Sequence, residues 1–165
     1  MALEEPTYDE YVATRWSSLY RTAYLLTGNH SDAEDLAQNA LVKAYLAWAK
    51  VMNAASPDAY VRRILTNTFV SGRRPMRITR ERLVDRIPDV AVTSDLNHDR
   101  LALWPHVAAL PPKQRAVIVL RYYEDLSERQ IADALGCSTG TVKSNASLAL
   151  ASLRSRITVT EGVLP

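Results

Sequence analysis

Several features that often reveal a protein's chemistry are scarce in this sequence. Only five glycines occur, and none belongs to a glycine-rich loop of the kind that binds nucleotide phosphates. The single cysteine, Cys137, has no partner for an internal disulfide, and the three histidines lack metal-ligand spacing. No long apolar run occurs, and the acidic N-terminus has no apolar core. We therefore expect a cytoplasmic protein without metal, cofactor or membrane contact.

The charge that is present is unevenly distributed. The net charge is only +2, but residues 62–82 hold seven arginines against one acid. A second, smaller excess of positive charge lies in residues 110–157, and an acidic stretch separates the two zones. Two basic zones indicate two contacts with a polyanion. A run of arginines is also typical of a solvated helix end, so charge alone does not decide between these interpretations.

The hydrophobic periodicity is helical throughout. It predicts a helix over residues 8–27 that ends at Gly28, and a second over residues 31–51 that a capping box of Ser31 and Glu34 begins. A third helix begins at Ser56 and ends near residue 72. Its expected inward side chains are Ala59, Tyr60, Ile64, Leu65 and Phe69.

The periodicity fails between residues 75 and 97, where prolines, arginines and aspartates are mixed. Helical spacing returns from residue 98 to residue 158, and residues 159–165 form a tail. The sequence therefore predicts an all-α fold, with two small helical domains, residues 1–74 and 98–158, joined by a flexible linker.

The most specific pattern lies in the second of these domains. Ser127 and Gln130 have the form of a capping box, which begins a short helix that ends at Gly136. A small residue at Ala132, then Gly136 and then Val142 have the spacing of a helix-turn-helix. The small residue allows close approach, and the glycine allows the turn. A plain helical hairpin is the alternative structure.

The second helix of such a motif enters the major groove with its N-terminal residues at the base edges. Serine, threonine and asparagine can read bases, and cations meet phosphates. Because the cations are few, we expect this domain alone to bind DNA weakly. The candidate DNA contacts are Ser138, Thr139, Thr141, Lys143, Ser144, Asn145 and Arg154.

Three stretches carry a family resemblance: AYLLTGNHSDAEDLAQNALVKAYLAW, YVRRILTN and LPPKQRAVIVLRYYEDLSERQIADALGCSTGTVKS. They resemble the extracytoplasmic-function (group 4) sigma factors of bacterial RNA polymerase, in particular the actinobacterial subgroup. The resemblance covers nearly all of residues 8–156. It implies an alternative sigma factor without catalytic activity, which binds core polymerase and directs promoter recognition and opening in transcription initiation.

The resemblance also implies roles for individual residues. The helix-turn-helix would read the minus-thirty-five element, and an anti-sigma factor is a further partner of many relatives. The surface that docks on the coiled coil of the polymerase's largest subunit would comprise Asp35, Leu36, Gln38, Asn39, Val42 and Lys43. The minus-ten element would contact Lys50, Asn53, Tyr60, Arg62, Arg63, Asn67, Arg73 and Arg74.

A splayed base needs a pocket or a stacking partner, and its strand needs cations, so the minus-ten assignment is chemically reasonable. The alternatives are an ordinary solvated face for the docking helix and core packing for Tyr60. Two departures from the family pattern bear on affinity. Asn145 and Leu148 stand where the family usually has arginine, which predicts weaker or altered promoter binding. Asn39 stands where glutamate is common, which predicts lower polymerase affinity.

A second functional hypothesis is a self-sufficient helix-turn-helix regulator that binds palindromic DNA as a dimer. It predicts tight DNA binding without polymerase. An enzyme has little support, because the acidic cluster of Asp32, Glu34 and Asp35 is explained by helix capping and the helix dipole.

Overall fold

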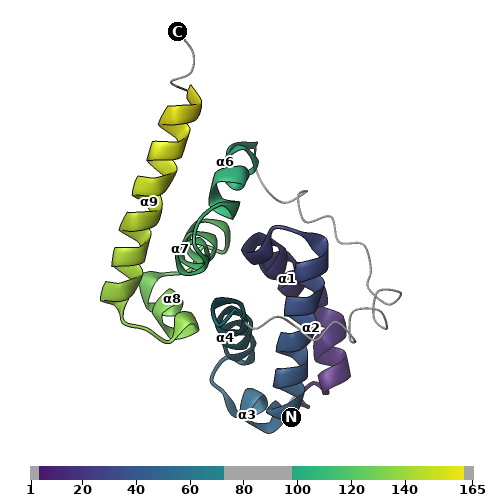
Figure 1. Ribbon diagram of the computed structural model, residues 1–165. Helices are drawn as coiled ribbons and strands as arrows, with labels where there is room; N and C mark the ends of the chain where they lie inside the picture. The colour runs from purple at the N-terminus through teal and green to yellow at the C-terminus, as the bar shows by residue number, and fades with distance from the viewer. Residues whose placement is uncertain (1–3, 73–97, 162–165) are drawn as a thin grey trace. The chain divides into compact units, whose positions relative to one another are not determined.

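All secondary structure is helical in the part of the chain that a computed structural model describes, residues 4–72 and 98–161 (Figure 1). The chain divides into two compact units, Met1–Val90 and Ala91–Pro165. The prediction of an all-α fold with two helical domains is confirmed. The predicted linker, residues 75–97, lies outside the described residues, so the predicted domain bounds stay predictions.

The first unit contains α1 (Tyr8–Thr27), α2 (His30–Leu46), α3 (Trp48–Asn53) and α4 (Pro57–Val70). The side chain of Thr7 caps α1, and that of Ser56 caps α4 by accepting a hydrogen bond from the N–H of Ala59 at 3.2 Å. Helix α1 ends at Gly28 with a φ of 85°, a left-handed conformation that glycine adopts without strain. The predicted end of α1 and start of α4 are therefore confirmed.

The start of α2 differs from the prediction. Its cap is Asn29, whose side chain accepts a first-turn N–H at 2.9 Å, so the capping box of Ser31 and Glu34 does not form. Glu34 is buried, and its Oε1 lies 2.6 Å from Nε2 of His30. The hydroxyl of Tyr20 bonds to Nδ1 of the same ring. Glu34, which the sequence predicts as part of an exposed cap, therefore belongs to a hydrogen-bonded network with His30 and buried Tyr20.

The end of α2 also differs. The helix ends at Leu46, and the separate six-residue helix α3 begins at Trp48, where the sequence predicts one continuous helix. The backbone of Ala47, with a φ of −113°, separates the two helices. Val51 is fully buried and holds α3 against the unit.

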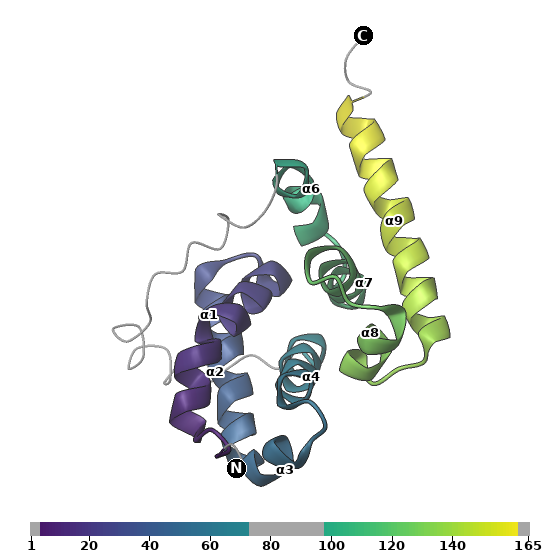
Figure 2. The same cartoon turned by 180° about the vertical axis from the view of Figure 1, so that it is seen from behind.

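The core of the first unit lies between α1, α2 and α4, which pack against one another (Figure 2). Apolar residues at helical spacing line the buried sides of α1 and α2. They include Tyr11, Trp16, Leu19, Tyr20, Ala23 and Leu26 from α1, and Ala33, Leu36, Ala37, Ala40, Leu41 and Ala44 from α2.

The predicted inward face of α4 is partly wrong. Of the expected residues only Leu65 is buried, whereas Ala59 is exposed and Tyr60 is half-buried. Thr66 and Thr68 are buried instead, beside Val61. Each threonine hydroxyl donates to a backbone carbonyl of the preceding turn, which satisfies it inside the core. A count of apolar residues cannot find this face because threonine forms half of it.

The second unit contains α6 (His98–Ala108), α7 (Pro112–Ile118), the π-helical turn η3 (Val119–Tyr123), α8 (Glu128–Leu135) and α9 (Thr139–Glu161). Helix α9 continues into the stretch that the sequence predicts as a tail. In η3 the N–H of Glu124 donates to the carbonyl of Val119 at 3.0 Å, five residues back. The sequence does not predict this π turn.

Helices α8 and α9 form the predicted helix-turn-helix. Both hydrogen bonds of the capping box between Ser127 and Gln130 are present, and Gly136 ends α8 with a φ of 66°. Fully buried Val142 holds α9 against α8. The buried cluster comprises Val117, Leu120, Ile131, Ala132, Ala134 and Val142, and Leu126, Leu135, Cys137 and Ala146 pack against it.

Candidate nucleic-acid and protein interfaces

The first turn of α9 presents most of the predicted minus-thirty-five contacts to solvent. Ser138 caps the helix by accepting the N–H of Thr141 at 3.1 Å, and the two hydroxyls lie 3.0 Å apart. The exposed predicted residues are Ser138, Thr139, Thr141, Lys143, Ser144 and Arg154. The helix therefore begins with hydroxyl groups and a cation on its surface, which suits base edges and phosphates.

Asn145 is the exception within this predicted set. Its side chain is half-buried, and its Nδ2 donates to the carbonyl of Thr141 at 3.1 Å. This bond directs one N–H of the amide back along its own helix, so that N–H is not available to a base while the bond is present. Leu148, the other departure from the family pattern, is 58% exposed.

Two cations beside α9 share one acid. Oε1 of Glu128 lies 3.2 Å from Nη1 of Arg121, and its Oε2 lies 3.8 Å from Nζ of Lys143. Arg121 comes from the π turn η3, and its guanidinium lies 5.9 Å from the centre of the Tyr122 ring. The charge near the start of α9 is thus partly neutralised within the unit.

The predicted minus-ten residues occupy two faces of α4. Tyr60, Arg63 and Asn67 follow each other at spacings of three and four residues, so they share one face of the helix. Arg63 and Asn67 are exposed, and Tyr60 is half-buried. Arg62 lies on another side, where its charge acts on Tyr11 of α1. The structure therefore brings three of these α4 residues together and separates the fourth.

A hydrogen-bonded cluster fixes the start of α4 against α1. The hydroxyl of Tyr11 donates to Oδ1 of Asp58 at 2.9 Å, and Nη2 of Arg15 lies 3.0 Å from Oδ2 of the same carboxylate. Burial raises the pKa of Tyr11 well above its usual value, and the bond to Asp58 adds to the rise, whereas the charges of Arg15 and Arg62 oppose it. The cluster thus sets the orientation of the candidate minus-ten helix.

The remaining predicted minus-ten residues lie before and after α4. Lys50 and Asn53 are exposed on the short helix α3. Arg73 and Arg74 follow α4 in the sequence but lie outside the described residues.

The predicted docking residues of α2 divide into buried and accessible groups. Asp35 and Leu36 are 7% and 6% exposed, so they offer a partner little surface. Gln38 and Asn39 are half-buried, and Val42 is 50% exposed.

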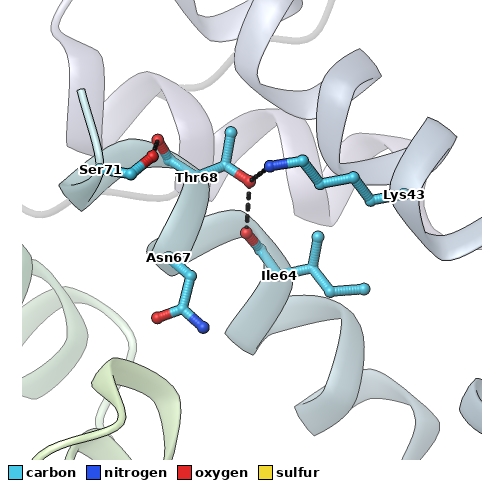
Figure 3. A pocket seen from close by; sticks show the side chains of 5 residues that line it. All are labelled: Lys43, Ile64, Asn67, Thr68 and Ser71. Carbon is cyan, nitrogen blue, oxygen red and sulfur yellow. Dashed lines mark hydrogen bonds between the residues drawn. The ribbon is translucent and has the colours of Figure 1, made fainter. Parts of the chain in front are cut away.

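Lys43, the last of the predicted docking residues, connects α2 with α4. Its side chain is exposed, and its Nζ donates to the hydroxyl of Thr68 at 2.9 Å (Figure 3). The bond crosses a pocket of about 340 Å³ whose lining also includes Ile64, Asn67 and Ser71. The predicted docking and minus-ten residues thus meet at this pocket.

Sequence reasoning missed four surface residues that the structure adds. Tyr45 and Leu46 are 61% and 79% exposed on α2, and they extend the apolar surface of Val42. Arg121 and Arg129 add cations close to the start of α8. The sequence does carry a signal for Tyr45 and Leu46, because apolar residues outside the buried stripe of an amphipathic helix often mark a partner surface.

Two kinds of feature are absent from the described part of the chain, a cluster of metal ligands and a long apolar helix. Its histidines, cysteine and acids form no group of three or more that could hold a metal ion. None of the helices in residues 4–72 and 98–161 has both the length and the apolar character that crossing a bilayer requires.

Comparison with known protein families matches both units. The model of Sigma-70 region 2 matches residues 14–75, and that of Sigma-70, region 4 matches residues 106–153. The first match includes α2, α3 and α4, and the second includes the helix-turn-helix. Each candidate surface therefore lies within a matched region, except that Arg154 follows the second match by one residue.

Full-length relatives support the same assignment. The chain is 40% identical over 152 residues to the RNA polymerase sigma-E factor of Streptomyces avermitilis. The alignment covers 91% of this chain and 84% of the relative. The chain is also 33% identical over 159 residues to the ECF RNA polymerase sigma factor SigL of Mycobacterium tuberculosis, and this alignment covers 93% of this chain and 88% of the relative.

Solved structures have the same fold. The sigma factor RpoE of Bartonella quintana, solved in complex with the anti-sigma factor NepR, is 26% identical and superimposes with a TM-score of 0.65 over 92% of this chain and 97% of that chain. CnrH, solved with the cytosolic domain of CnrY, superimposes with a TM-score of 0.58 at 22% identity, over 92% of this chain and 88% of its own. The chain therefore belongs to the extracytoplasmic-function sigma factors of RNA polymerase, the alternative sigma factors that direct transcription initiation.

Proposed function

We propose that the two units divide promoter recognition between them while core polymerase holds both. The second unit contacts the minus-thirty-five element through the major groove, and the first contacts the minus-ten element. The observation that carries this proposal is the exposed start of α9, the second helix of the helix-turn-helix, which presents hydroxyl groups and Lys143 to solvent. Two individually weak contacts suffice, because a shared scaffold raises their effective concentration.

The minus-ten contact would use one face of α4 together with α3. Tyr60 supplies an aromatic ring for an unstacked base, and Arg63 supplies charge for its strand. Lys50 and Asn53 are exposed on the preceding helix α3. Arg73 and Arg74, directly after the end of α4, would hold phosphates of the upstream duplex.

The docking contact would use the exposed surface of α2. Val42, Tyr45 and Leu46 form an apolar strip on this helix, and exposed apolar patches mark protein contacts. This strip lies toward the C-terminal end of α2, whereas the predicted Asp35 and Leu36 are buried. We therefore assign the contact with the coiled coil of the largest polymerase subunit mainly to this strip, with Gln38 and Asn39 at its edge.

The protein would act by binding alone, and polymerase would carry out the chemistry, in the cytoplasm where both meet the chromosome. An anti-sigma factor is a further proposed partner, because the sigma factor RpoE was solved in complex with one. The comparisons do not favour the dimeric regulator, because the matches follow both units in order and cover most of the sigma-factor relatives.

Run-off transcription tests the proposal. Purified core polymerase is given a library of genomic fragments with and without the protein, and the RNA 5′ ends are sequenced. We expect new start sites that depend on the protein and share two spaced elements. Unchanged start sites, or tight binding of palindromic DNA by the protein alone, would contradict the proposal.

The docking strip has a separate test with a matched control. Replacing Val42 and Leu46 with aspartate places two charges on the apolar strip, so we expect at least a tenfold loss of polymerase affinity. Replacing Ala13 and Ser17 of α1, both exposed and four residues apart, with aspartate adds the same charge elsewhere. Equal affinity losses in the two variants would contradict the docking assignment.

Promoter opening tests the basic residues of the first unit. Replacing Arg63, Arg73 and Arg74 with glutamine removes cations from the proposed minus-ten surface, so we expect loss of opening with polymerase association retained. Opening is measured by permanganate footprinting and association by co-purification. Loss of association would mean that these arginines belong to the docking surface.

A further inference from the structure

The first turn of α8 places an acid against two cations, one of which, Lys143, belongs to the surface proposed to face DNA. One oxygen of Glu128 meets Arg121 at 3.2 Å, and the other meets Lys143 at 3.8 Å. A single carboxylate therefore joins a cation from the π turn to a cation from the proposed reading helix. The three residues come from η3, α8 and α9, and their pairing depends on the helix-turn-helix packing.

These pairs are open to competition. The side chains of Glu128, Arg121 and Lys143 are 34%, 37% and 65% exposed. Partly exposed ion pairs are weak, because water screens them, so an incoming phosphate can displace the carboxylate. The guanidinium of Arg121 also lies 5.9 Å from the centre of the exposed Tyr122 ring, within the range of a cation–π contact. Both cations are therefore accessible, although Glu128 partly neutralises them.

The position of the acid determines its effect on DNA. In a helix-turn-helix the first helix crosses the phosphate backbone while the second enters the major groove. We propose that Glu128 is an internal counter-ion, which competes with promoter phosphates for Arg121 and Lys143 and so sets the strength and salt dependence of minus-thirty-five binding. This inference rests on the proposed function, in which α9 contacts the minus-thirty-five element.

The proposal has a thermodynamic consequence. A cation that is already paired with Glu128 gains less from meeting a phosphate, and after displacement the free carboxylate repels the backbone. The second unit then binds duplex DNA weakly by itself. Weak binding makes promoter selection depend on polymerase, which supplies the other contact at high effective concentration.

The test uses the full chain and a fluorescent 30-base-pair duplex of mixed sequence, titrated at several salt concentrations. The variant is Glu128→Gln, which keeps the side-chain shape and removes the charge. Ser127 and Gln130 form the capping box of α8 without Glu128, so α8 keeps its start. The matched control is Asp133→Asn, which makes the same charge change at an exposed residue of the same helix.

We expect Glu128→Gln to tighten duplex binding about three- to tenfold, and to steepen the dependence of log affinity on log salt by about one to two units, since two cations become free for phosphates. Asp133→Asn changes the affinity less than twofold and leaves the slope unchanged. Circular dichroism melting checks that both variants fold like the parent chain.

A second arm identifies the route of the effect. In a chain that already carries Arg121→Gln and Lys143→Gln, Glu128→Gln no longer tightens binding beyond the Asp133→Asn control. A gain that persists in this background, or equal effects of Glu128→Gln and Asp133→Asn in the parent chain, would overturn the inference. If the parent chain directs no transcription with polymerase, the proposed function fails instead, so the two failures are distinguishable.

Discussion

The two units of this sigma factor bury polar groups to different degrees. In the described residues of the first unit, α1, α2 and α4 bury Thr22, Glu34, Asp35, Thr66 and Thr68. Within residues 102–158 of the second unit, by contrast, the buried side chains are apolar or aromatic. The threonine hydroxyls donate within their own helices, and bonds of Tyr11 to Asp58, Tyr20 to His30 and Lys43 to Thr68 join the helices of the first unit.

This difference corresponds to the surfaces that each unit is proposed to present. The first unit presents two, on α2 and on α4, and the bond between Lys43 and Thr68 joins these helices directly. The contact of Tyr11 with Asp58 then fixes α4 against α1. Hydrogen bonds constrain the rotation of a helix about its axis more than apolar contacts do. The second unit presents one surface, which the helix-turn-helix geometry already orients.

The largest expected effect tests whether the two cores are separate. Leu65 in α4 and Ile131 in α8 are both fully buried. Replacing either with alanine is expected to cost about 2–5 kcal/mol of unfolding free energy, because it leaves a cavity. Hydrogen exchange should show the lost protection only in the unit that carries the substitution. Loss of protection in both units would break the comparison.

The next effect concerns the buried acid of the first unit. His30→Ala removes the partner 2.6 Å from Glu34, so we expect a loss of about 1–2 kcal/mol, less than for a fully buried pair because the His30 side chain is 60% exposed. Adding Glu34→Gln to this variant removes the stranded charge and should restore part of the stability in urea unfolding. If the unfolding free energy does not recover, the pairing of His30 with Glu34 does not stabilise the unit.

A smaller effect of about 1 kcal/mol is expected for Tyr11→Phe, which removes the hydrogen bond to Asp58. The raised pKa of Tyr11 adds a pH signature, because the folded unit favours the protonated phenol. That stability is fully present below the ordinary tyrosine pKa of 10.0 and is lost as the pH rises above it.

Thermal unfolding at pH 8 and pH 10.5 checks this signature. The parent chain should lose more stability than the variant between the two values. The variant keeps the smaller contribution of Tyr8, whose pKa burial also raises. Equal losses would mean that Tyr11 does not carry the effect.

The smallest expected effect concerns the hydrogen bond between Lys43 and Thr68, which joins α2 and α4 in the first unit. Lys43→Met keeps the aliphatic chain and removes the bond to Thr68, so we expect a loss of about 0.5 kcal/mol, at the low end because Lys43 is exposed. Lys50→Met is the control, since Lys50 is an exposed lysine of the same unit. Denaturant midpoints that shift equally would argue against a bond that orients the two helices.

The sequence predicts those parts of the fold that local chemistry determines. Gly28 and Gly136 end helices because they adopt left-handed backbone, and Ser56 and Ser127 begin them because their hydroxyls accept first-turn N–H groups. The apolar stripes of α1 and α2 follow from periodicity. These signals act within a few residues, so they can be found without knowledge of the packing.

Other features depend on contacts that are distant in sequence. Asn29 and Ser31 are both good caps, and the tertiary environment selects Asn29. The break at Ala47 and the π turn after Ile118 have no glycine or proline signal.

The candidate surfaces are predictable to a similar extent. Most of the α9 residues that the sequence predicts as outward are exposed, but the pairing of Glu128 with Lys143 becomes visible only when α8 and α9 are packed.

The π turn at Val119–Tyr123 is a place where the second unit can absorb a change in chain length. Its hydrogen bond closes over one residue more than that of an α-helix, so a one-residue deletion there can restore regular α geometry and leave the side chains before and after it in register. The same deletion in the middle of a regular helix would instead rotate every later side chain by about 100°.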